Sequence, residues 1–477
     1  MKQALIFLGI LILVVFSRLP MIFSDHFVVD GDEAILGLMC MDVLEHGRWW
    51  PIFWGQNYGF VLPEMLTCIP FMYVFGVSVF TAKVPMLLWF ASGVFFMHRS
   101  LDLFTPPRLK WLLTILVIVA PTWLLWSMRL RGGYLPAFAL TQLLIYLAFR
   151  FQSWNLQRAS LIGLLMGLIF VQQAIWLPGA LLVALVSWRR SGRPTKLALL
   201  TLLFSLLPFA LLLPFRLDEP YHQPQFFVFS AEVFSFNASV MLSYLERGMQ
   251  GLHLHGWAYR DLVSANVFSI AFLGLKAAVV VTFLVSLRYR PQVNFKLALT
   301  LAILSLLGWS LFLGSAAPRY ALPLFGYGIL LMAMVWKSSR QSWFYGTVLL
   351  MIGLSVNTLI SSNKIHYEDF TRSEMNGLMA TFGEQGVEVV FTENYLLQWQ
   401  VMFYSEGKIV ARSKRYTDRR MDRFDGIDAM YTSYPEKTAL VDWTKEQRIQ
   451  SDWNNDAFFV DFEPKEEVLR ELNFELY

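Results

Sequence analysis

The chain has 477 residues, of which 56% are hydrophobic and 16% charged. A water-soluble fold of this composition would expose far more apolar side chains than its interior could hold, which excludes a soluble multi-domain protein. The formal net charge is +4 and no basic block stands out, which argues against a nucleic-acid partner. The composition therefore predicts an α-helical polytopic membrane protein.

About eleven segments are apolar enough to cross a membrane, given that a spanning helix needs roughly 20 predominantly apolar residues. No small-residue cleavage site follows the first, residues 4–22, which therefore predicts a membrane helix and not a signal peptide. The fifth and sixth nearly join at VQQAIWLPG, where Gln172, Gln173 and Pro178 predict a break. The other predicted spans are 80–98, 110–127, 134–150, 159–173, 175–188, 197–215, 264–286, 297–314, 319–336 and 343–360.

The short loops predict the orientation, because Lys and Arg accumulate on the cytoplasmic side during insertion. One set of loops is basic and is therefore placed inside: 99–110, 150–158, 189–196, 288–296 and 337–340. The opposite set is then on the outer face: loop 23–79, the RLRGGY loop, segment 217–262 and the SAAPRY loop.

The chain changes in character at residue 361, after which charged and turn residues are frequent and no window could span a membrane. Four short apolar runs predict strands, and ENYLLQWQVMFY between them has a helical pattern. The runs are VEVVFT (387–392), KIVA (408–411), TALVDW (438–443) and FFVDF (458–462). We therefore expect a transmembrane domain over 1–360 and a small soluble α/β domain over 361–477 on the outer (periplasmic) face.

The polar interval from Asp30 to Glu64 concentrates carboxylates, aromatic residues and turn residues between apolar segments. Asp30 and Glu33 have the spacing of a capping box, so a helix is expected to begin here, lie along the membrane surface and end at Gly47. Asp32 is the carboxylate whose role local structure explains least, which makes it the candidate catalytic residue. The alternative is that all three carboxylates only satisfy backbone amides and the helix dipole.

The order of these motifs resembles bacterial members of the GT-C glycosyltransferase superfamily, nearest the branch of protein O-mannosyltransferases and aminoarabinose transferases. The resemblance rests on DGDEAILGLMCMDVLEHGRWWPIFWGQNYG after an apolar helix, on RLRGGYLPAFALTQLLIYLAFR (129–150), on APRYALP (317–323), and more loosely on ENYLLQWQVMFYSEGKIVAR. It implies an enzyme of the bacterial cytoplasmic (inner) membrane that transfers a hexose or pentose from a polyprenyl-phosphate carrier. The acceptor is a hydroxyl of a lipid, glycan or protein on the outer face, and the transfer is usually inverting.

The same resemblance assigns roles to individual residues. The family's acidic pair, which carries the catalytic Asp, corresponds to Asp32 and Glu33, with Asp30 as a further catalytic candidate. Aminoarabinose transferases hold the lipid phosphate with a Lys placed after the Tyr of this loop, whereas the sequence after Tyr58 offers only Glu64. Arginines of other loops would then bind the phosphate, since guanidinium suits bidentate contact. The substrate-binding candidates are Tyr58, Glu64, Arg129, Arg131, Tyr134, Arg319 and Tyr320.

Other readings stay open at this stage. Each arginine has the alternative role of a cation that reaches lipid headgroups, and membrane lipids are expected partners in any case. His253 and His255 resemble a pair of metal ligands, but no carboxylate pattern lies nearby, so no metal ligand is assigned. No cofactor is assigned either, and the use of a divalent metal stays an open alternative. The rival functions are a transporter or flippase of a lipid-linked saccharide, with Lys276 near a midplane site, and an idle subunit that docks partners.

Overall fold

The computed structural model describes residues 2–54, 59–151, 153–192, 195–217, 232, 235, 322–339, 343–360, 367–413, 435–443, 453–455, 457–472 and 474. The chain divides into two compact units. The first comprises Met1–Pro20, Tyr58–Phe60 and Met86–Ser362, and the second comprises Met21–Asn57, Val61–Pro85 and Asn363–Tyr477. The predicted spans 264–286 and 297–314 lie outside the described residues.

The first unit is helical throughout its described part. Its helices, together with the short α2 that leads out of it, are α1 (Lys2–Phe16), α2 (Leu19–Ile22), α6 (Met86–Leu101), α7 (Pro107–Val119), α8 (Pro121–Trp126), α9 (Tyr134–Arg150), α10 (Leu156–Gln172), η1 (Ala174–Trp176), α11 (Leu177–Arg190), α12 (Thr195–Leu217), α16 (Leu322–Ser339) and α17 (Trp343–Ile360). Each predicted span within the described residues overlaps one or two of these helices. The predicted break between the fifth and sixth spans is η1, which separates α10 from α11.

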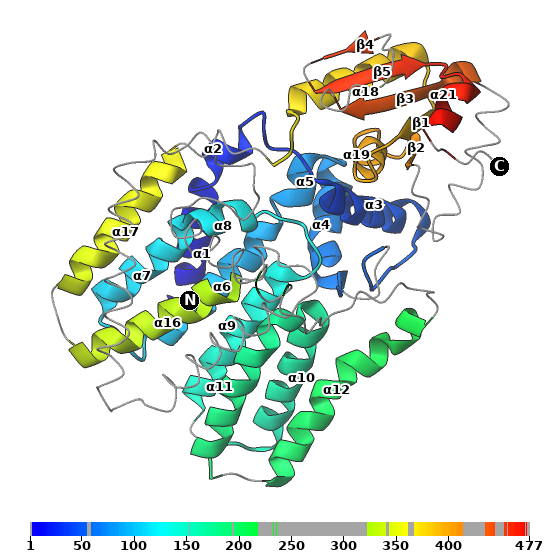
Figure 1. Cartoon of the computed structure of the whole chain (residues 1–477). Coiled ribbons are helices and arrows are strands. Elements are labelled where there is room, and N and C mark those ends of the chain that lie inside the picture. Colours follow the sequence, from blue (N-terminus) through cyan, green and yellow to red (C-terminus); the bar gives the residue numbers. More distant parts are fainter. Residues whose placement is uncertain are drawn as a thin grey trace. The chain divides into compact units, whose positions relative to one another are not determined.

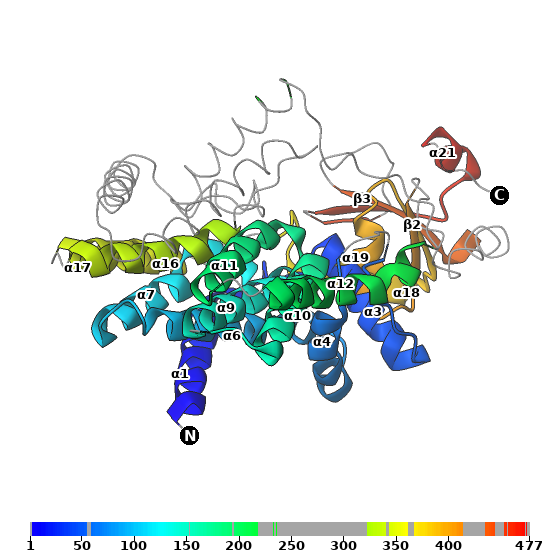
Figure 2. The same ribbon diagram turned by 90° about the horizontal axis from the view of Figure 1, so that it is seen from below.

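Helices α9, α10, α11 and α12 lie side by side (Figures 1 and 2). Two glycines one turn apart, Gly163 and Gly167, allow α10 and α12 to approach closely. A Cβ atom at either position would overlap a backbone carbonyl oxygen of α12, that of Thr201 or that of Ser205. Small residues four positions apart are the usual means by which membrane helices bring their backbones together.

The surface of α12 is suited to lipid. In its most apolar 18-residue window 17% of the residues are buried, and its exposed side chains are mostly leucines. Two helices in the described part of the chain are long and apolar enough to cross a membrane, Val79–Leu101 and Thr195–Pro214. Shorter apolar helices are Lys2–Phe16, Leu62–Phe75, Tyr134–Arg150, Leu156–Gln172 and Phe344–Gly353. The described residues thus form a mostly helical fold, with one small sheet in the second unit.

The second unit joins part of the N-terminal region to the C-terminal region. Its elements are α3 (Gly31–His46), α4 (Leu62–Phe75), α5 (Val79–Lys83), α18 (Arg372–Gln385), β1 (Val389–Thr392), α19 (Leu397–Tyr404), β2 (Val410–Ser413), η4 (Pro435–Lys437), β3 (Thr438–Trp443), β4 (Trp453–Asn454), β5 (Phe458–Phe462) and α21 (Glu466–Glu471). The segment 23–79 therefore holds α3, α4 and the start of α5.

The sheet has the strand order β2-β1-β3-β5-β4 (Figure 1). Strand β1 is parallel to β2 and β3, whereas β5 is antiparallel to β3 and β4. All four apolar runs named from the sequence form strands, because β-branched and aromatic residues suit a pleated surface covered by other elements. ENYLLQWQVMFY contains α19, which connects the parallel strands β1 and β2 as a crossover helix.

Helix α3 begins and ends as predicted. The Asp30 carboxylate accepts a hydrogen bond from the Glu33 amide, and the Glu33 carboxylate accepts one from the Asp30 amide, which completes the capping box. Gly47 ends the helix in the left-handed conformation, with φ of 69°, and its amide donates to the Val43 carbonyl.

The extent to which α3 is buried was not predicted, and its position along the membrane surface stays a prediction. From Gly31 to Val43 every residue of this helix except Asp32 is buried, including the polar Asp42. The reason is a second helix, α19, which packs closely against it. A Cβ atom at Gly31 would lie 2.6 Å from Leu396, and one at Gly37 would overlap the Phe403 ring.

Candidate functional site

The N-terminus of α3 carries the three carboxylates that the sequence singles out. Two of them form the cap: Asp30 is 4% exposed and Glu33 is fully buried. The two hydrogen bonds of the capping box are both 2.9 Å long. An N-cap of this kind satisfies amides that the helix leaves without partners in its first turn. Local structure therefore accounts for Asp30 and Glu33.

Asp32 differs from its neighbours in exposure. Between Phe27 and Val43 it is the one residue that is not buried. It lies in the first turn of α3, where the positive end of the helix dipole favours a negative charge. A rigid helix end thus presents a single partly exposed carboxylate, which is what a group that must meet a substrate requires.

Lys83, at the end of α5, is the residue of this region that sequence reasoning missed. Its Nζ donates to the Glu33 carboxylate at 2.6 Å and to the Val28 carbonyl at 2.9 Å, and both charged side chains are fully buried. It also lies 3.8 Å from the centre of the Tyr367 ring. The sequence contained one sign of its role: Lys83 lies in the predicted span 80–98, where an unpaired lysine would carry a large free-energy cost.

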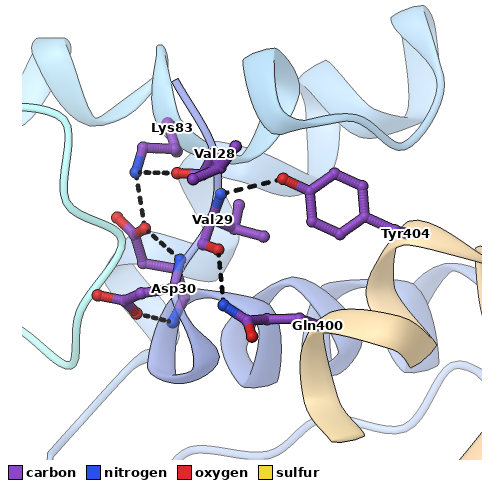
Figure 3. A network of polar contacts seen from close by, with 7 residues as sticks. Val28, Val29, Asp30, Lys83, Gln400 and Tyr404 are labelled. Atoms are coloured by element: carbon purple, nitrogen blue, oxygen red, sulfur yellow. Dashed lines mark hydrogen bonds and ion pairs between the residues drawn. The ribbon is translucent and has the colours of Figure 1, made fainter. Parts of the chain in front are cut away.

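Two side chains of helix α19 form hydrogen bonds to the backbone of Val29, the residue before the N-cap Asp30 (Figure 3). Gln400 Nε2 donates to the Val29 carbonyl at 3.1 Å, and the Val29 amide donates to the Tyr404 hydroxyl at 3.3 Å. Burial raises the pKa of Tyr404 well above its usual value, and the Glu33 and Glu368 carboxylates raise it further. The Tyr404 hydroxyl therefore stays protonated and neutral beside the cap.

Glu64, a predicted substrate-binding residue, lies in the first turn of α4 and is fully buried. Burial and the nearby Glu64 carboxylate together raise the pKa of the Cys40 thiol in α3, so Glu64 faces the interior of the second unit. The predicted ligand Tyr58 lies outside the described residues.

The RLRGGY loop lies in the first unit and leads into α9. Arg129 is 1% exposed and Arg131 is partly exposed. Tyr134 begins α9, and its ring centre lies 5.2 Å from that of Trp126. The glycines between them both have positive φ, 57° at Gly132 and 88° at Gly133, so the loop makes a turn that few other residues could adopt.

The loop is held against the break that follows α10. Gln173 Nε2 donates to the Gly132 carbonyl at 2.6 Å. A Cβ atom at Gly133 would lie 2.5 Å from Gln172 Oε1 and 2.8 Å from the Gln172 carbonyl oxygen. The two glutamines that predict the break therefore fix the shape of the arginine-bearing loop.

Gly133→Ala is expected to destabilise the protein more than Gly192→Ala. Both glycines have φ of 88°, so the alanine at either position would have to adopt a left-handed backbone conformation, which costs about 1–2 kcal/mol of stability. Only the Cβ at Gly133 meets Gln172, whereas nothing lies within 4 Å of one at Gly192. Thermal unfolding of the two variants in detergent measures the difference, and equal melting temperatures would contradict the contact.

The described site residues other than Glu64 belong to two groups. Asp30, Asp32 and Glu33 share one helix end in the second unit, and Arg129, Arg131 and Tyr134 share one loop in the first. Arg319 and Tyr320, with His253 and His255, lie outside the described residues. Within the part of the chain that the structure describes, no group of three or more His, Cys, Asp or Glu could hold a metal ion.

Comparison with known proteins identifies the fold. No protein-family model matches the sequence, and no curated protein does. Among solved structures, two crystal structures of ArnT from Cupriavidus metallidurans match, one bound to undecaprenyl phosphate and one in the apo state. Each has a TM-score of 0.61 at 11% sequence identity, and the match covers 96% of this chain and 97% of ArnT. This chain therefore shares the fold of ArnT, which confirms the predicted resemblance at the level of the fold.

Proposed function

We propose that the chain is a polyprenyl-phosphate-dependent glycosyltransferase of the bacterial cytoplasmic membrane, with its reaction on the outer face. The observation that carries the proposal is Asp32, the partly exposed carboxylate at the rigid N-terminus of α3. The fold shared with ArnT, one structure of which is bound to undecaprenyl phosphate, supports a lipid-phosphate carrier as the donor. The sugar is a hexose or pentose, and the acceptor is a lipid, glycan or protein hydroxyl.

In the proposed reaction, the acceptor oxygen attacks the anomeric carbon of the donor sugar. A bond forms between these two atoms as the bond from the anomeric carbon to the phosphate oxygen breaks, which inverts the configuration. Asp32 takes the proton of the acceptor hydroxyl or orients that hydroxyl, and a positioned carboxylate of this kind contributes about 10²–10⁴ in rate. The lipid phosphate leaves with the bonding electron pair.

The departing phosphate gains negative charge, so a cation beside it lowers the barrier. Arg129 and Arg131 on the RLRGGY loop and Arg319 in APRY are the proposed ligands, with Tyr134, Tyr320 and Tyr58 as further contacts to the donor. Asp30 and Glu33 support the helix end that carries Asp32. Of the described ligands, Arg131 is partly exposed, whereas Arg129 and Glu64 are buried.

The test is transfer of a labelled sugar from undecaprenyl phosphate by the purified full-length protein in vesicles. We expect label to move to an acceptor hydroxyl in proportion to the lipid-linked donor supplied. The free sugar, or a nucleotide-activated sugar without the lipid, should give no product. Movement of the intact lipid-linked sugar across the vesicle without cleavage of its phosphate bond would instead support the transporter or flippase.

A further inference from the structure

The chain that leads into the catalytic helix end has no secondary structure of its own up to Asp30. Its polar backbone groups from the Val28 carbonyl to the Asp30 amide are nonetheless all bonded to side chains. Lys83 Nζ donates to the Val28 carbonyl, and the Glu33 carboxylate accepts a hydrogen bond from the Asp30 amide. Between them, both backbone groups of Val29 are bonded to α19.

The bonds to Val29 come from residues one helical turn apart. Gln400 and Tyr404 lie on the same side of α19, since positions four apart share a helix face. Figure 3 shows their side chains reaching Val29 from one helix, the amide to the carbonyl and the hydroxyl to the N–H. They replace the two hydrogen bonds that a neighbouring strand would provide.

The same helix also fits closely against the first turns of α3. Leu396 fills the space that a side chain at position 31 would need, and the Phe403 ring fills that at position 37. Interiors packed this tightly transmit small shifts instead of absorbing them. A displacement of α19 would therefore move the backbone on which Asp32 is placed.

We propose that α19 of the C-terminal region is a positioning element for Asp32, and that Gln400 and Tyr404 are the residues through which it acts. The proposal rests on the proposed function of Asp32, three residues beyond Val29. It gives the C-terminal region a direct part in the reaction geometry, in addition to any contact that it makes with an acceptor. Neither residue touches the reacting atoms.

The expected kinetic effect is on kcat. A misplacement of a catalytic group by about 1 Å costs up to roughly 100-fold in rate. Loss of one of several bonds to the same segment should cost less, so we expect Gln400→Met and Tyr404→Phe each to lower kcat about 3- to 10-fold and together about 10- to 100-fold. KM for the lipid donor should change less than twofold, because neither side chain is proposed to bind it.

Hydrogen exchange of the full-length protein in vesicles directly measures how strongly α19 restrains the backbone around Val29. We expect the amides of peptide 27–36 to exchange about three- to tenfold faster in Tyr404→Phe, because the Val29 amide loses its acceptor. Gln400→Met keeps the volume of the side chain but removes the donor to the Val29 carbonyl. Tyr404→Phe keeps the ring, so it tests the hydroxyl even if the other variant folds poorly.

The matched controls are Gln398→Met and Tyr395→Phe. Gln398 lies on the same helix and accepts a hydrogen bond from the Ser413 amide at 2.8 Å, so its loss weakens the contact to strand β2 without reaching Val29. Tyr395 is 52% exposed. Both controls should leave the exchange of peptide 27–36 and kcat within twofold of the unaltered protein.

Two results would overturn the positioning role. One is unchanged exchange of peptide 27–36 in both test variants, and the other is faster exchange with an unchanged kcat. The exchange measurement needs no donor, so it is independent of the transferase assay. Absence of sugar transfer by the unaltered chain would overturn the proposed function, whereas unchanged exchange would overturn the hold by α19 whatever the activity.

Discussion

Asp32→Asn is expected to slow sugar transfer by about 10²- to 10⁴-fold, the usual contribution of a positioned general base. Asn retains the shape of the side chain but cannot take the acceptor proton. The side chain is partly exposed and is not the N-cap, so the melting temperature should change little. Initial rates with a labelled undecaprenyl-phosphate sugar, together with thermal unfolding of the same preparation, measure both effects.

Asp30→Asn is the informative comparison for this variant. Asn is about as good an N-cap as Asp, so the bond to the Glu33 amide should survive. If Asp32 is the base, Asp30→Asn should lose far less activity than Asp32→Asn. The reverse order would transfer the catalytic role to Asp30, and full activity of Asp32→Asn would remove Asp32 from the mechanism.

Lys83→Met is expected to cost about 3–5 kcal/mol of stability, as is usual when one partner of a buried ion pair is removed. Glu33 is fully buried and would lose the ammonium group that lies 2.6 Å from it. The Val28 carbonyl would lose its donor as well. The measurement is unfolding of the full-length protein in detergent, by heat and by denaturant.

The double variant Lys83→Met with Glu33→Gln separates charge from packing. Gln is neutral and can still accept the Asp30 amide bond, so the double variant should recover a large part of the stability that the single variant loses. A double variant no more stable than Lys83→Met would show that the ion pair is not the cause. Lys408→Met is a suitable control, because its ion pair with Glu406 is exposed and should contribute little.

Features that depend on near neighbours in the chain could be predicted from the sequence. The capping box needs only Asp30 and Glu33, three positions apart, and Gly47 is a sufficient stop signal. The helix Tyr134–Arg150 has the bounds that its apolar run predicts. Strands β1, β2, β3 and β5 follow from short apolar runs with β-branched residues, whereas β4 was not predicted.

Features that join distant segments could not be predicted in this way. Lys83 lies 50 positions from Glu33, and Gln400 and Tyr404 lie 371 and 375 positions from Val29. Periodicity marks which residues are apolar but not which helix will cover them. The residue pattern of α3 therefore could not predict that α19 covers it.

The hydrogen bonds from α19 to Val29 also determine when, during synthesis of the chain, the N-terminus of α3 can reach its final structure. The Glu33–Lys83 pair can form once the first hundred residues are made, but the partners of Val29 follow 371 and 375 positions later. At synthesis rates of about 5–20 residues per second, that separation amounts to roughly 20–75 seconds. During this interval the nascent chain has Asp32 without α19 beside it, so under the proposed function its working geometry would form only after the C-terminal region has been made and has folded.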